Sequence, residues 1–111
     1  MKRICVLLMR LPTSEEEARR MLSPACHASK KNAEAAIYLL GEGVFWIKGL
    51  MPKKYLGNAL DLGAEVKVSR RDLLARGISE STNEKRFKLL DDLEGELVDD
   101  VMGKTDRVVS W

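Results

Sequence analysis

The sequence predicts an α/β fold in which a mostly parallel sheet is covered by helices on both faces. Short apolar runs, typical of strands buried on both sides, alternate along the 111 residues with amphipathic stretches of helical period. Strands separated by helices need right-handed crossovers, which favour parallel pairing. The elements follow the order β-α-β-α-β-α-α-β. An α+β fold with one antiparallel edge strand is the alternative.

The first strand and helix have the clearest signals. Residues 4–9 form a continuous apolar run, and Thr13 or Ser14 can cap the helix that follows. Three glutamates, residues 15–17, lie in its first turn, where the helix dipole favours acids. Pro24 predicts that this helix bends, or that a second helix starts there.

The rest of the chain continues the alternation. Residues 35–40 and 64–68 predict two further strands, and residues 107–111 predict the last. Residues 44–47 predict a short helix or turn packed on the sheet. Three helices are expected at residues 54–62, 70–76 and 89–102, and a glycine follows each of them: Gly63, Gly77 and Gly103. Ser69 is expected to cap the second of these three.

Length and composition set limits on the class of protein. With 45% hydrophobic residues the chain can form a core without disulfides or a metal, which excludes disorder for most of it. We expect one domain over residues 1–111. The longest apolar runs are shorter than the roughly 20 residues of a membrane span and the roughly 7–15 of a signal peptide. The sequence therefore predicts a cytoplasmic protein with no membrane association.

Charge is small in sum and uneven along the chain. The net charge of +2 is too small to predict direct nucleic-acid binding. Residues 53–76 carry six bases and three acids, a net +3, whereas residues 91–100 carry six acids and no base. A solvated acidic helix face beside a mildly basic loop is one interpretation. Two patches that meet partner proteins are the other.

Few residues are available for metal or nucleophilic chemistry. The thiols of Cys5 and Cys26 and the single imidazole of His27 do not make up the four ligands of structural zinc, so we expect no metal and no cofactor. Cys5 lies in an apolar strand and is expected to be buried. Cys26 lies near His27, Lys30 and Lys31, and cationic neighbours favour a reactive thiolate. Packing of Cys26 against the core is the alternative.

Ligand sites in open parallel sheets lie beyond the carboxyl ends of the strands. Here those ends are residues 10–14, 41–44 and 69–71, and the three loops should converge. The Gly41-Glu42-Gly43 sequence is a weak phosphate-binding signal, and a tight turn that needs a positive φ explains it as well.

Several segments resemble the DsrE/DsrF/DsrH-like family. Residues 66–78 look like its third strand and following helix, which ends in Ala-Arg-Gly and an aliphatic residue. The Pro-containing loop at residues 11–14 and the strand that runs into Gly41-Glu42-Gly43-Val44 are similar to the family's first two strand ends. The DsrH/TusB branch is favoured by the motif Asp-Leu-Leu-Ala-Arg-Gly-Ile at residues 72–78 and by the final Trp111.

The resemblance implies a three-layer, flavodoxin-like α/β/α subunit that assembles into trimers or hexamers with itself or with paralogous DsrE/DsrF-like subunits. The family works in sulfur relay, either in dissimilatory sulfur metabolism or in thiolation of the tRNA wobble uridine, with a sulfur-donor protein as a further partner. Its DsrE/TusD branch carries a persulfide cysteine in the loop after the third strand, where this sequence has Ser69. DsrH/TusB-like subunits also lack that cysteine, and some carry one on the first helix, close to Cys26.

Two functions follow as expectations. The first is a subunit of a cytoplasmic sulfur-relay assembly that acts as an oligomerisation partner and as a secondary carrier through Cys26, with Ser69, Arg70 and Gly43 as binding residues. The second is a stand-alone DsrE-like homo-oligomer that binds a small molecule or protein at the Ser69 loop without sulfur transfer. A hydrolase or transferase that uses the strand-end loops is a more distant third. A cluster of large apolar residues is expected to lie partly between subunits: Phe45, Trp46, Leu50, Met51 and Tyr55.

Overall fold

The sheet is five-stranded and entirely parallel in the computed structural model, which describes residues 2–111. Its strand order is β4-β3-β2-β1-β5. The strands are β1 (Arg3–Leu8), β2 (Glu34–Leu39), β3 (Glu65–Ser69), β4 (Phe87–Leu90) and β5 (Arg107–Ser110). Because every pairing is parallel, the prediction of a parallel sheet is confirmed and the antiparallel alternative is wrong.

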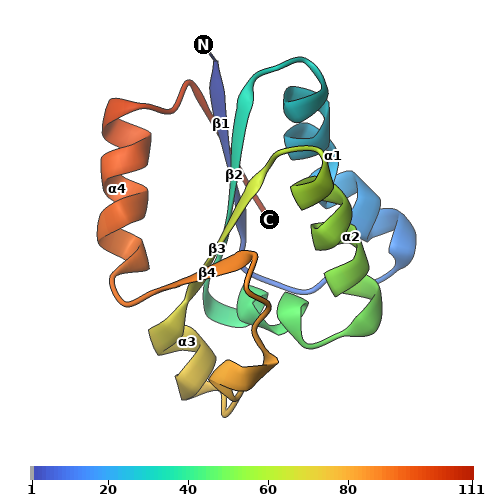
Figure 1. The fold of residues 1–111 in the computed structure, drawn as a ribbon, viewed down its shortest axis with the longest axis vertical. Coiled ribbons are helices and arrows are strands. Elements are labelled where there is room, and N and C mark those ends of the chain that lie inside the picture. Colours follow the sequence, from blue (N-terminus) through green and yellow to red (C-terminus); the bar gives the residue numbers. More distant parts are fainter. Residues whose placement is uncertain (1) are drawn as a thin grey trace.

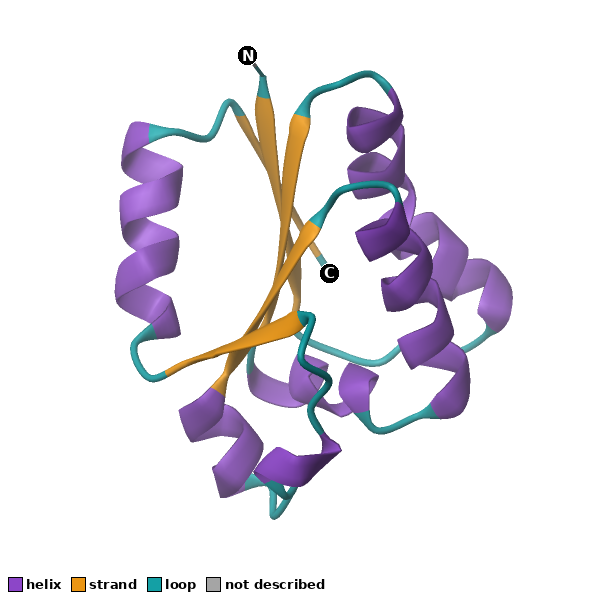
Figure 2. Cartoon of the chain, in the orientation of Figure 1, coloured by secondary structure: helices purple, strands orange, loops and turns teal. Residues whose placement is uncertain are grey.

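Helices lie on both sides of this sheet (Figures 1 and 2). They are α1 (Glu15–Lys30), α2 (Leu50–Asp61), α3 (Arg70–Ala75) and α4 (Leu93–Gly103), with two 3-10 segments, η1 (Gly41–Ile47) and η2 (Glu80–Thr82). α1 and α2 cover one face, and α4 alone covers the other. The strand order explains why α4 lies apart from α1 and α2. From β1 to β4 each new strand is added on the same side of the one before it, whereas β5 is added on the other side of β1. Because crossovers are right-handed, the helix of this last connection lies on the opposite face of the sheet.

Strand β4 does not follow from the sequence pattern, which instead predicts the start of a helix at Leu89. The strand is only four residues long, and Leu89 and Leu90 share a helical spacing with Leu93 and Leu97. Its pairing with β3 decides the conformation, with Val66 beside Phe87 and Ser69 beside Leu90. The helix therefore begins later, at Leu93, where the Asp92 side chain accepts a hydrogen bond from the Gly95 N–H.

The structure also decides two other helix starts. α2 begins at Leu50, four residues before the predicted start at residue 54, with Gly49 as its N-cap. Pro52 lies in the first turn of α2, where a missing N–H costs no helical hydrogen bond. At α1 the structure selects Ser14 as the cap, since its Oγ accepts a hydrogen bond from the Glu17 N–H at 3.1 Å.

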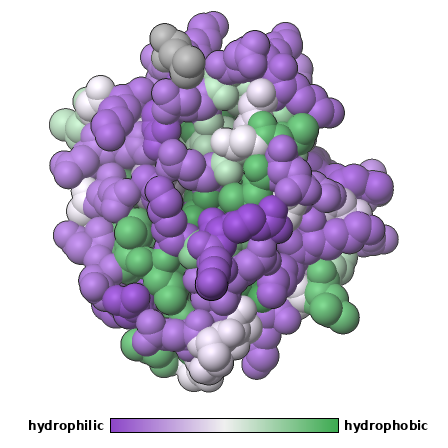
Figure 3. Space-filling view, viewed as in Figure 1, coloured by the Kyte–Doolittle hydropathy of each residue, from purple (hydrophilic) through white to green (hydrophobic). Residues whose placement is uncertain are grey.

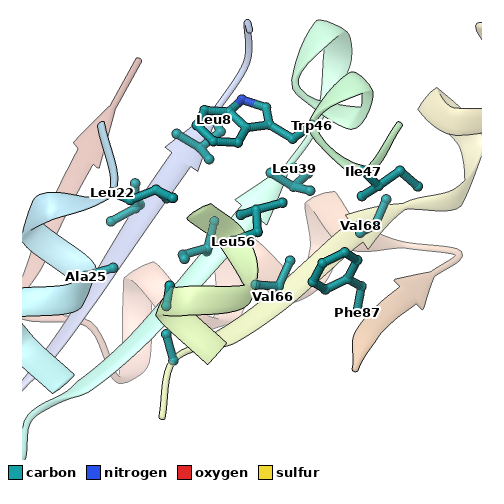
Figure 4. Close-up of a cluster of buried hydrophobic side chains, with 14 of the residues drawn as sticks. Leu8, Leu22, Ala25, Leu39, Trp46, Ile47, Leu56, Val66, Val68 and Phe87 are labelled. Atoms are coloured by element: carbon teal, nitrogen blue, oxygen red, sulfur yellow. The ribbon is translucent and has the colours of Figure 1, made fainter. Parts of the chain in front are cut away.

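The larger core lies between the sheet and the α1/α2 layer. Leu8, Leu39, Val66 and Val68 point from the strands toward Leu22 and Leu56 of the helices (Figure 4). Trp46 and Ile47 close the carboxyl end of this core, and Phe87, the first residue of β4, lies beside Val66. The opposite face has a much smaller apolar cluster under α4, formed by Cys5, Ala36, Tyr38 and Leu93. Polar contacts therefore contribute much of the attachment of α4.

None of the helices in the described part of the chain combines the length and the hydrophobicity that a membrane crossing requires.

Candidate functional site

The three loops at the carboxyl edge of the sheet converge, as predicted. The Leu40 N–H donates to the Leu8 carbonyl at 3.3 Å, which ties the β2 loop to the end of β1. The Trp46 indole N–H donates to the Arg10 carbonyl at 2.8 Å. The Asp72 carboxylate accepts from the Gly41 N–H at 2.8 Å, which ties the same β2 loop to α3.

Both glycines of the β2 loop serve the geometry of this turn. Gly41 has φ +58, a conformation that glycine adopts without strain. A Cβ on Gly43 would overlap the carbonyl oxygen of Leu8, so η1 can approach the end of β1 only because residue 43 has no side chain. The tight-turn interpretation of this sequence is therefore confirmed. A phosphate-binding role is not required to explain either glycine.

Ser69 caps α3, as the sequence predicted. It is buried, and its Oγ accepts a hydrogen bond from the Asp72 N–H at 3.2 Å. A pocket lined by Ser69, Arg71 and Asp91 has a volume of about 20 Å³, enough for about one water molecule. Ser69 and Gly43 thus lie at the same edge of the sheet, and the substrate-binding role of Ser69, Arg70 and Gly43 stays a prediction.

Ser69→Ala is expected to lower the free energy of unfolding by about 1 kcal/mol, because the Asp72 N–H loses its partner at the start of a six-residue helix. Ser69→Thr keeps a hydroxyl and is expected to keep most of the stability. Urea unfolding of the two variants beside the wild type measures the difference. Equal stability of Ser69→Ala and the wild type would contradict the capping role.

Arg70 and Arg71 are paired within the chain. Arg70 Nη1 lies 2.6 Å from Asp91 and its Nε lies 2.9 Å from Glu80, while Arg71 Nη2 lies 2.5 Å from Glu94. Hydrogen bonds to these acids raise the pKa of both guanidinium groups. Bases of residues 53–76 and acids of residues 91–100 therefore neutralise each other in part. This favours a solvated, internally paired surface for these residues over two patches that meet partner proteins.

Cys26 lies far from this edge. α1 runs unbroken from Glu15 to Lys30 through Pro24, so the predicted restart at Pro24 is wrong and Cys26 is not in a first helical turn. At 1.5 Å per residue, Cys26 is about 17 Å along the axis from Glu15, toward the amino ends of the strands. The side chain is half-buried against the core, the alternative that the sequence left open.

This environment does not activate the thiol. Burial raises the pKa of Cys26, and nearby Lys30 only partly offsets that effect, so the lowered pKa expected from the sequence is wrong. Burial also raises the pKa of Cys5, which has no exposed surface and lies 2.9 Å from Thr105 Oγ1. Access, rather than thiolate character, distinguishes the two cysteines.

Iodoacetamide is expected to modify Cys26 well before Cys5 in the folded protein, and to modify Cys26 more slowly than a free thiol at the same pH. Mass spectrometry of peptides after timed alkylation measures both rates, and the urea-unfolded chain provides the reference in which both cysteines react alike. Equal protection of both thiols in the folded state would show that Cys26 is closed to reagents.

A buried polar cluster that the sequence did not predict lies beneath α4. Arg3 Nε and Nη2 each donate to Asp100 at 2.7 Å, so the pair is bidentate. Tyr38 Oη donates to the same carboxylate at 2.5 Å, and Thr105 Oγ1 donates to it at 2.6 Å. Lys67 Nζ lies 3.5 Å from Tyr38 Oη and 2.7 Å from Glu96. We call Arg3, Tyr38, Lys67, Asp100 and Thr105 the Asp100 cluster.

Hydrogen bonds and burial set the charges in this cluster. The hydrogen bonds from Arg3 hold the pKa of Asp100 well below its usual range. Burial, and then the Asp100 carboxylate, raise the pKa of Tyr38, so the phenol stays protonated and donates. The sequence placed Asp100 on a solvated acidic helix face, but the residue is 4% exposed. The missed signal was a base in each of two strands that helices cover on both faces, Arg3 in β1 and Lys67 in β3.

The comparisons with known proteins identify the fold. No family model and no curated protein matches the sequence. Among solved structures, the chain is similar to the crystal structure of the ychN protein from E. coli, with a TM-score of 0.77 over 100% of both chains and 17% sequence identity. The predicted α/β architecture is thus confirmed, and it is DsrE-like, a flavodoxin-like arrangement.

Proposed function

We propose that this chain is a subunit of a cytoplasmic sulfur-relay assembly of DsrE/DsrF/DsrH-like proteins, in which it acts as an oligomerisation partner. The DsrE-like fold supports membership of the family, and the motifs at residues 66–78 and 41–44 support it independently. Within the family, the DsrH/TusB branch fits best. Its relay serves dissimilatory sulfur metabolism or thiolation of the tRNA wobble uridine.

The residue at the end of β3, where the family's carriers have their cysteine, carries the proposal. A persulfide carrier needs a sulfur atom there, and this chain has Ser69, whose hydroxyl accepts a hydrogen bond from the first turn of α3. Arg70 and Arg71 beside it are paired with acids of the same chain. Ser69, Arg70 and Arg71 therefore stabilise this edge of the fold, and a partner subunit would supply the principal carrier cysteine.

A secondary sulfur-carrying role would fall to Cys26, because Cys5 has no exposed surface. In that step the Cys26 thiolate attacks the outer sulfur of a donor persulfide. A new S–S bond forms on Cys26, the donor S–S bond breaks, and the donor cysteine leaves as a thiolate. The raised pKa of Cys26 makes this step slow unless a partner subunit changes its surroundings.

The start of α2 is the surface that we assign to subunit contacts. Leu50 is 93% exposed there, and Met51 and Tyr55 are only partly buried. Trp46 is fully buried and belongs to the core, so the predicted interface cluster shrinks to its other members. Figure 3 shows hydrophobic groups in separate patches among hydrophilic ones on one face of the molecule.

Two measurements test this function. Sedimentation velocity at micromolar concentration is expected to show a trimer, a hexamer or a complex with a DsrE-like paralogue that carries a loop cysteine, and Leu50→Glu should weaken the assembly. Leu62→Glu, at an exposed leucine just after α2, is the matched control. A monomer that binds no such paralogue would contradict the proposal.

Incubation with a cysteine desulfurase and cysteine, followed by mass spectrometry, tests the carrier role. A gain of one sulfur atom on the wild type, lost in Cys26→Ser, would establish secondary carriage, whereas no gain would limit the chain to the partner role. A homo-oligomer that gains no sulfur and binds no DsrE-like paralogue would favour the alternative function, a stand-alone binding protein without sulfur transfer.

A further inference from the structure

A groove of about 750 Å³ lies at the amino ends of the strands, opposite the loops described above. The second half of α1 forms one wall through Pro24, His27 and Ala28, and its C-cap Lys31 continues that wall. The starts of β1 and β5 form the other. The volume is in the range of small-molecule sites, which is roughly 300–1,000 Å³. Cys26 does not line it, because a helix turns about 100° per residue and places Cys26 on the opposite flank of α1 from Pro24 and Lys31.

Bases outnumber acids in the lining of this groove. Its lining contains four bases, Lys2, Arg3, Lys31 and Arg107, and one acid, Asp106, a net +3. The whole chain carries 19 bases and 17 acids, so the remaining 15 bases and 16 acids leave the rest of the molecule at −1. Because Arg3 is paired with Asp100 and Glu34, the excess positive charge at the groove comes from Lys2, Lys31 and Arg107.

Three of these four bases have no partner among residues 2–111. Arg3 is held by Asp100 and Glu34, and the Asp106 carboxylate accepts the Arg3 backbone N–H at 2.8 Å. The side chains of Lys2, Lys31 and Arg107 form no salt bridge or hydrogen bond within residues 2–111, and the same holds for other exposed bases such as Lys85 and Lys88. What distinguishes these three is that they line one groove.

The helix dipole does not account for this arrangement. A lysine at the end of α1 is expected from the dipole alone, and Lys31 is the C-cap of that helix. Lys2 and Arg107 belong to the ends of two strands, where no such field operates. Three like charges around one hollow repel one another, and an anion in the groove would relieve that repulsion.

We propose that this groove binds a phosphorylated small molecule of nucleotide size. Lys2, Lys31 and Arg107 would hold the phosphate, since ammonium and guanidinium groups are the strongest donors to phosphate oxygens. The body of the ligand would lie on the apolar wall made by Ile4, Pro24 and Ala28. A concave site of this volume fits a small molecule better than the long backbone of RNA.

Isothermal titration calorimetry tests the site with AMP and UMP as probes, and with adenosine, inorganic phosphate and a single-stranded RNA oligonucleotide as comparisons. Both nucleotides are expected to bind with a Kd below about 1 mM, more tightly than adenosine or phosphate alone. Lys31→Gln and Arg107→Gln are each expected to weaken binding roughly tenfold, because each removes one charge-assisted contact. Raising the salt concentration should weaken binding further.

Lys88→Gln is the matched control, an exposed lysine on β4 away from the groove, and should change the Kd less than twofold. Melting temperatures of the variants verify that each is folded. Failure of both nucleotides to bind at millimolar concentration, binding of the oligonucleotide alone, or an equal loss in Lys88→Gln would each overturn the proposal.

Discussion

Asp100→Ala is expected to lower the free energy of unfolding by about 3–5 kcal/mol, the largest effect that we foresee for any single substitution outside the apolar core. The substitution leaves the guanidinium of Arg3 buried without its bidentate partner, and it removes the acceptor of the Tyr38 and Thr105 hydroxyls. Arg3 would keep only the exposed carboxylate of Glu34. A buried charge that loses its buried partner costs far more than the loss of an exposed ion pair.

Urea unfolding followed by circular dichroism measures this loss. Asp99→Ala is the matched control, because Asp99 is the neighbouring acid on the same helix and is exposed; its effect should stay within about 0.5 kcal/mol. Similar losses for the two variants would show that the Asp100 cluster adds no more than general charge effects on α4.

The same cluster predicts a dependence on pH. The pKa of Asp100 is lower in the folded chain than the roughly 3.9 of an unfolded aspartate. The stability contributed by its ionised form is therefore complete above about pH 4 and is lost as the pH falls toward the folded pKa. The difference in unfolding free energy between the wild type and Asp100→Asn should shrink in acid, and a difference constant with pH would contradict the ionised pair.

Gly43→Ala is expected to cost about 2–4 kcal/mol, because the added Cβ would overlap the Leu8 carbonyl and force η1 away from the end of β1. Trp46 and Ile47 lie on η1 and fill the carboxyl end of the core, so the displacement would also loosen their packing. Chemical denaturation measures the loss of unfolding free energy. The tryptophan bands of the near-ultraviolet circular dichroism spectrum should become weaker in the same variant.

Gly57→Ala provides the control for Gly43→Ala. Gly57 lies inside α2, and the nearest atom to its added Cβ would be Arg86 Nη2 at 3.7 Å, an ordinary contact. Alanine there should stabilise the protein by roughly 0.5–1 kcal/mol, since glycine loses more backbone entropy in a helix. A Gly43→Ala variant as stable as the wild type would show that η1 tolerates a side chain at residue 43.

Local sequence signals located most helices and strands, but they did not predict the Asp100 cluster or the environment of Cys26. Continuous apolar runs identified β1 and β2, and the capping residues Ser14 and Ser69 marked the starts of α1 and α3 because a cap depends on residues three positions apart. The alternation of strands and helices was enough to bring the carboxyl-edge loops together, since parallel strands end at one edge of their sheet. Local signals could not predict the pKa of the Cys26 thiol. That pKa depends on whether Pro24 breaks the helix and on how deeply the core buries the thiol.

The sequence by itself determined the parallel α/β architecture, the turn at Gly41 and the cap at Ser69, because each rests on periodicity or on contacts between near neighbours in the chain. Only the tertiary structure decided that a four-residue stretch becomes β4, that Asp100 is buried against Arg3 from 97 residues away, and that Lys2, Lys31 and Arg107 surround one groove. These outcomes depend on strand order, and strand order arises from packing over the whole chain rather than from any local pattern.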